Sequence, residues 1–118
     1  MSRSLVLPAR GLMVANTLRE TRSSFDRMRG LIGRPLREGE ALLISSCRQV
    51  HTFGMREPID VVFCDEEWTV LHVVSPMRPW RVGKWVRGAR CAIELSPGAA
   101  RGISPGDRFE LVERPVGA

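Results

Sequence analysis

The sequence contains few of the features that mark secreted or membrane proteins. It has only three cysteines, Cys47, Cys64 and Cys91, at wide spacings and without a Cys-x-x-Cys pair, which argues against a disulfide framework. No stretch approaches the ~20 apolar residues that a membrane-spanning helix needs. The first ten residues also lack the apolar run of a signal peptide. We therefore expect a protein without a membrane span, located in the cytoplasm with its thiols reduced.

Catalytic and cofactor signatures are also missing. The sequence carries no glycine-rich dinucleotide or phosphate loop and no Gly-x-Ser-x-Gly nucleophile motif. Cys47 and His51 are four residues apart, but no second close pair completes the spacing of a metal site. We therefore predict neither a metal nor a cofactor. The absence of a recognisable catalytic set favours a binding or accessory domain over an enzyme.

Lysine is almost absent as well. Lys84 is the only lysine among 18 basic residues, which face 13 acidic ones and give a formal net charge of +5. Arginine suits bidentate recognition of carboxylates and phosphates, although a GC-rich genome produces the same bias. The positive balance makes nucleic acid or an acidic surface a candidate partner, but it does not bear on the fold.

The composition and patterning predict one small, mostly β domain. The chain has 118 residues, 43% of them apolar, with eleven glycines and eight prolines that mark frequent turns. Short apolar runs predict strands, among them 59–64, 70–74 and 91–95, and the acidic residues between the first two predict a hairpin. Apolar residues at helical spacing predict one helix over 23–33, in the N-terminal region. We expect a mainly β (α+β) fold, a barrel-like or sandwich domain over residues 1–118, because six to eight short strands must curl or fold over to enclose a core.

Several ordered motifs along the chain carry a resemblance to a known family. They are RMRGLIGR at 27–34, VHTFGMR at 50–56, PIDVVF at 58–63, GARCAIELSPG at 88–98 and GISPGD at 102–107. In this order and spacing they resemble the DUF192 family of small bacterial and archaeal proteins, over roughly residues 10–112. The resemblance implies a compact β-rich fold with a helix. It implies no activity or substrate, since none is established for the family.

Polar side chains are concentrated between residues 51 and 60. A loop of that composition can aim several side chains at one point, and His51 can act as a general base if a carboxylate orients it. The first hypothesis is a pocket that binds a small ligand or a protein segment, and a hydrolase-type enzyme that uses His51 with a carboxylate is a further alternative. The candidate lining residues are His51, Thr52, Met55, Asp60, Glu94 and Arg29. The structural alternative is that the polar groups satisfy backbone atoms while Met55 fills the core.

The surroundings of Glu94 bear on these alternatives. It lies in the predicted strand 91–95, where alternation places it on the face opposite to Ile93. If that face is enclosed, the carboxylate needs a partner such as His51 or Arg29, because an unpaired buried charge is costly. A buried glutamate with a partner in a cleft is a candidate site residue, although structural ion pairs have the same signature.

The most basic stretch, residues 76–90, contains no acidic residue. Its cations recur at every third position, and two tryptophans lie between them. Single-stranded nucleic acid is bound by such a combination, because cations meet phosphates and exposed rings stack on bases. The residues of this alternative are Arg78, Trp80, Arg81, Lys84, Trp85 and Arg87. The structural alternative is a solvated loop whose tryptophans cover the core, so the exposure of the two indoles discriminates between them.

Overall fold

The computed structural model describes residues 2–21 and 35–114 of the chain, and strands dominate them. Their elements are β1 (Ser2–Leu7), the 3-10 turn η1 (Pro8–Arg10), β2 (Leu12–Ala15), β3 (Thr17–Thr21), β4 (Glu40–Ser45), β5 (Ile59–Cys64), β6 (Val70–Met77), β7 (Cys91–Leu95) and β8 (Glu110–Arg114). The mainly β prediction is therefore confirmed. The helix expected over 23–33 is not borne out: it falls outside the described ranges, which themselves contain no α-helix.

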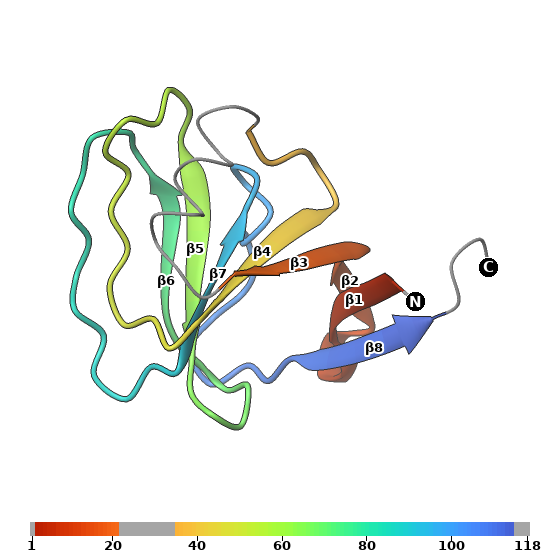
Figure 1. Cartoon of the computed structure of the whole chain (residues 1–118). Helices are drawn as coiled ribbons and strands as arrows, with labels where there is room; N and C mark the ends of the chain where they lie inside the picture. The colour runs from red at the N-terminus through yellow and green to blue at the C-terminus, as the bar shows by residue number, and fades with distance from the viewer. Residues whose placement is uncertain (1, 22–34, 115–118) are drawn as a thin grey trace.

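The strands form two separate sheets (Figure 1). The smaller sheet has the order β2-β1-β8, and the larger one has the order β3-β4-β7-β5-β6. All pairs are antiparallel except β3 with β4, which run parallel. The larger sheet ends at β3 on one side and β6 on the other, so it does not close on itself. The barrel-like alternative is therefore wrong, because the strands remain in two sheets with open edges.

The first of two hydrophobic cores joins the two sheets. Its side chains come from β1, from one face of the larger sheet and from the segment after β7, and include Leu5, Leu7, Leu43, Val62, Ile93, Ile103 and Phe109. Odd and even positions of β5 and β7 alternate between the faces of the sheet. The members of this core on those strands are therefore the even positions of β5 and the odd positions of β7.

The second core lies on the other face of the larger sheet. There Leu42, Ile44, Val61, Phe63 and Ala92 are covered by side chains from irregular chain segments, among them Leu36, Val50, Met55, Val86 and Ala89. Because both faces are covered, every residue of β5 and of β7 is buried. This burial explains the nearly continuous apolar run at 59–64. It also places the segments 46–58 and 78–90 as a layer over the sheet.

Candidate functional site

The segments 46–58 and 78–90 lie side by side and are joined by backbone hydrogen bonds (Figure 1). The amide of Gly83 donates to the Val50 carbonyl over 2.9 Å, and the amide of Trp80 donates to the Thr52 carbonyl over 2.9 Å. We call the outer face of these two segments the paired-loop surface. It is built from stretches about 30 residues apart in the chain, which local sequence patterns do not connect.

Thr52 fastens this pairing from inside. Its side chain is fully buried, and its hydroxyl donates to the carbonyl of Arg78 over 2.6 Å. The same oxygen accepts from the amide of Arg81 over 3.0 Å. Thr52 thus satisfies backbone groups in the turn that carries Trp80, and the buried Met55 packs in the second core. Both contacts match the structural alternative for these two candidate residues.

Aromatic side chains gather on the outside of the same segments. The rings of His51 and Phe53 have centroids 5.4 Å apart, and those of Phe53 and Trp80 are 6.3 Å apart. Trp80 is 63% exposed and Trp85 is 60% exposed. The two indoles are therefore mostly exposed, which disagrees with the expectation that they cover the core. The rings of His51, Phe53 and Trp80 neighbour one another on this face.

The backbone holds Trp80 outward at an energetic cost. Its φ angle is +61°, in the left-handed region that non-glycine residues rarely adopt. Such a conformation costs on the order of 1–3 kcal/mol and persists only where the surroundings impose it. The hydrogen bonds to Thr52 on both sides of this residue supply that constraint.

Cations alternate with the exposed tryptophans along the segment 78–90. Arg78, Arg81, Lys84 and Arg87 are all exposed, and none of them forms an ion pair with another residue in the described ranges. Arg81 makes long contacts of 3.4 Å with two backbone carbonyls of its own loop. Their charges are therefore directed to solvent, beside rings that are also exposed.

Asp60 and Glu94 lie on opposite faces of the larger sheet. In the β5–β7 register Asp60 is opposite Leu95, whereas Glu94 is opposite Val61. Residues opposite each other in an antiparallel ladder share a face. Asp60 therefore belongs to the side of the first core and Glu94 to the side that the paired loops cover. The sheet separates these two fully buried carboxylates, so Asp60 and Glu94 do not line one pocket.

Asp60 has its own set of partners on its face. Its Oδ2 accepts from the Ser75 hydroxyl over 2.7 Å and from the Ala100 amide over 2.8 Å. These contacts tie the turn after β7 to β5 and β6. Arg29, the remaining candidate lining residue, lies outside the described residues.

Metal-ligating side chains are scattered through the described part of the chain. Within residues 2–21 and 35–114 there is no group of three or more His, Cys, Asp or Glu side chains placed to hold a metal ion. Cys64 and Cys91 face each other across β5 and β7, and both are buried and free. The same part of the chain has no helix long and apolar enough to cross a membrane.

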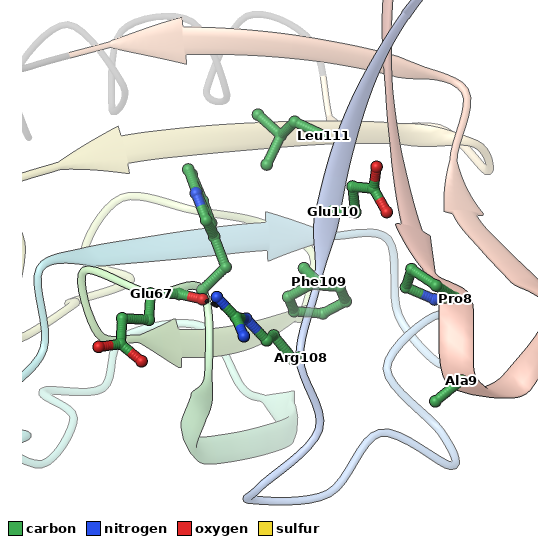
Figure 2. A pocket seen from close by; sticks show the side chains of 8 residues that line it. Pro8, Ala9, Glu67, Arg108, Phe109, Glu110 and Leu111 are labelled. Atoms are coloured by element: carbon green, nitrogen blue, oxygen red, sulfur yellow. Dashed lines mark hydrogen bonds between the residues drawn. The ribbon is translucent and has the colours of Figure 1, made fainter.

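A groove of about 620 Å³ opens away from the paired-loop surface. It lies between η1, the β5–β6 turn and the start of β8. Figure 2 shows the ring of Phe109 between Pro8 on one side and Arg108 on the other. The Arg108 Nε donates to the backbone carbonyl of Glu67 over 3.0 Å. Glu67 and Glu110 both line the groove and bring two carboxylates to it. Charges of both signs line an apolar floor, so this groove offers no single ligand chemistry. Sequence reasoning did not find it, because its walls come from three distant segments.

Comparison with known proteins identifies the family. The family model described as "DUF192: Uncharacterized ACR" matches residues 6–111. The chain belongs to the DUF192 family. The resemblance seen in the ordered motifs is thereby confirmed, and the family description assigns this DUF192 protein no function.

Three similar proteins agree with the assignment. A UPF0127 protein of Pyrococcus abyssi is 35% identical over 65 residues, which are 53% of this chain, and the chain spans 55% of that curated relative's length. A structure from Sinorhizobium meliloti, named a "putative transcription regulator", is 20% identical with a TM-score of 0.75 and covers 92% of this chain and 90% of its own. A protein of unknown function from Novosphingobium aromaticivorans is 19% identical with a TM-score of 0.70, covering 92% and 82%. At these identities the two structures support the fold alone.

Sequence reasoning missed part of the paired-loop surface of this DUF192 protein. Phe53 and Val82 are 42% and 59% exposed on these segments. The ring of Phe53 lies beside that of Trp80, and Val82 pairs with His51. A signal for Phe53 was available, because alternation around the buried Thr52 points His51 and Phe53 outward together. Val82 carried no such signal, since its neighbour across the loops, His51, is 31 residues away.

Proposed function

We propose that this DUF192 protein binds single-stranded nucleic acid through the paired-loop surface. The observation that carries the proposal is the exposure of Trp80 and Trp85, at 63% and 60%, among cations that form no ion pair with described residues. The opposite facing of Asp60 and Glu94 further argues against a polar pocket lined by both carboxylates.

Two physical terms supply the affinity. Stacking of a base on an exposed aromatic ring is worth about 1–3 kcal/mol and accepts any base. Lysine and arginine side chains that meet phosphates release counterions, which adds affinity that falls with salt. Arg78, Arg81, Lys84 and Arg87 are spaced along the same segment as the rings. A strand that follows this segment meets cations and rings in turn.

Salt dependence tests the electrostatic term. For single strands the logarithm of the affinity falls with a slope of about −0.7 per neutralised phosphate, so four contacts predict about a 50-fold loss between 50 and 200 mM salt. Fluorescence anisotropy of a labelled oligonucleotide measures this loss. Lys84→Ala should reduce the slope by about 0.7. No binding at 50 mM salt would exclude the proposed function.

Substitution of the ring tests the stacking term. We expect Trp80→Ala to weaken oligonucleotide binding about tenfold, from the loss of one stacked base. Met13→Ala is the matched control for an exposed apolar side chain, since Met13 is 49% exposed on the smaller sheet. Arg101→Ala is the control for an exposed cation elsewhere. Equal losses in all three variants would contradict a localised surface.

We infer further that residues 1–118 act as one domain in the cytoplasm. The wide spacing of three cysteines without a Cys-x-x-Cys pair supports a reducing compartment. The family match over 6–111 supports a single unit, because it spans nearly the whole chain.

A further inference from the structure

An open hollow of about 350 Å³ adjoins the paired-loop surface at Trp85. It lies where β4 ends and the segment 46–58 begins. Its volume is at the lower end of small-molecule sites, which suits one planar ring system rather than a longer ligand. Its lining includes the side chains of Arg48, Gln49 and Trp85.

Two polar side chains of the hollow are held in place by backbone carbonyls. The Gln49 Nε2 donates to the Gly83 carbonyl over 3.0 Å, and the Arg48 Nε donates to the Ala89 carbonyl over 3.2 Å. Each side chain keeps recognition groups beyond these contacts: the Gln49 Oε1 as an acceptor and the Arg48 terminal nitrogens as donors. A side chain fixed in this way loses little entropy when a ligand arrives.

We infer that this hollow takes one unstacked guanine base of a bound strand, a conclusion that rests on the proposed function. Trp85 supplies the stacking wall. The terminal nitrogens of Arg48 donate to the acceptors O6 and N7 of guanine, which is the commonest specific contact of arginine with a base. The Gln49 Oε1 accepts from the adjacent N1–H group.

The same groups discriminate against the other bases. Adenine presents an amino donor where guanine presents O6, so the donors of Arg48 would face another donor. A pyrimidine offers less ring area to Trp85. Trp80, by contrast, stands outside the hollow and stacks on any base. The surface therefore combines a non-selective platform with one selective position.

A set of three oligonucleotides tests the inference. The first is a twelve-nucleotide oligothymidylate, and the other two carry one central guanine or one central adenine in the same strand. Anisotropy is measured at 50 mM salt on the full chain. We expect the guanine strand to bind about tenfold more tightly than the other two, since a good bidentate contact discriminates by about 1–3 kcal/mol.

Two variants link the preference to the hollow. Arg48→Lys retains the charge but not the fork of donors, so we expect it to abolish the guanine preference and to leave oligothymidylate affinity and its salt slope unchanged. Gln49→Leu should reduce the preference in the same way. A thermal unfolding scan confirms that each variant folds. Arg101→Ala serves as the control and should keep the full preference.

The outcomes separate the subsite from the surface. Equal, salt-sensitive binding of all three strands, or a preference for adenine, would overturn the guanine subsite and leave the proposed function standing. Absence of binding by any strand would overturn both. A guanine preference that survives in Arg48→Lys would also overturn the assignment, because the discrimination would then come from other groups.

Discussion

Two cysteine thiols face each other near the ends of the central strands β5 and β7. A thiol–thiol hydrogen bond with Cys91, together with burial, raises the pKa of Cys64 far above the usual range of a thiol. The pKa of Cys91 is lowered, because its sulfur takes part in the same hydrogen bond as the acceptor. Cys64 therefore keeps its proton in the folded protein at a pH where an unfolded chain releases it.

This retained proton predicts a loss of stability at high pH. Above pH 9 the unfolded chain releases the Cys64 proton while the folded protein keeps it. The free energy of unfolding should then fall by about 1.4 kcal/mol per pH unit. The sequence has no tyrosine and one lysine, so few other groups titrate there. Below the ordinary thiol pKa of about 8.5 the contribution of Cys64 is constant.

Urea unfolding under reducing conditions at pH 8, 9 and 10 measures this effect. Cys64→Ala should flatten the dependence above pH 9, because the variant has no retained proton at that position. Parallel curves for the two proteins would contradict the assignment of the retained proton to Cys64.

At the scale of elements, the pairing of the two loops depends on one glycine. A Cβ atom at Gly83 would lie 2.9 Å from the Val50 carbonyl oxygen, a backbone atom that cannot rotate away. We expect Gly83→Ala to separate the segments 46–58 and 78–90. The variant should lower the free energy of unfolding by about 1–3 kcal/mol, as overpacking does. It should also weaken oligonucleotide binding, because Trp80 and Trp85 are displaced.

Gly11→Ala provides the matched control for this prediction. Nothing lies within 4 Å of a Cβ atom at Gly11, but its φ angle is +59°, so the substitution costs about 1–2 kcal/mol from backbone strain alone. Oligonucleotide affinity should be unchanged in this variant. An unchanged affinity in Gly83→Ala would show that the rings do not depend on the loop pairing.

At the scale of the whole molecule, the larger sheet separates the first core from the face that carries the paired-loop surface. The first core joins the two sheets on one face, and the second core carries the paired loops on the other. A substitution confined to the first core should therefore change stability without changing binding. Ile93→Val is such a change, and we expect a loss of about 0.5–1.5 kcal/mol.

Thermal unfolding and oligonucleotide anisotropy on the same Ile93→Val sample check this separation. The melting temperature should fall while the affinity stays within error at a temperature where the variant is folded. Loss of affinity in the folded variant would mean that the two faces of the sheet are coupled.

The sequence by itself determined the β-rich fold, the family, the strands 59–64 and 91–95 and the basic stretch 76–90. These follow from local periodicity, turn residues and ordered motifs. Tertiary structure alone decided that Asp60 and Glu94 face opposite sides of one sheet, because strand register depends on pairing between distant segments. It alone also decided that Trp80 and Trp85 point outward. Their exposure follows from hydrogen bonds and a glycine contact between segments about 30 residues apart, which no local pattern encodes.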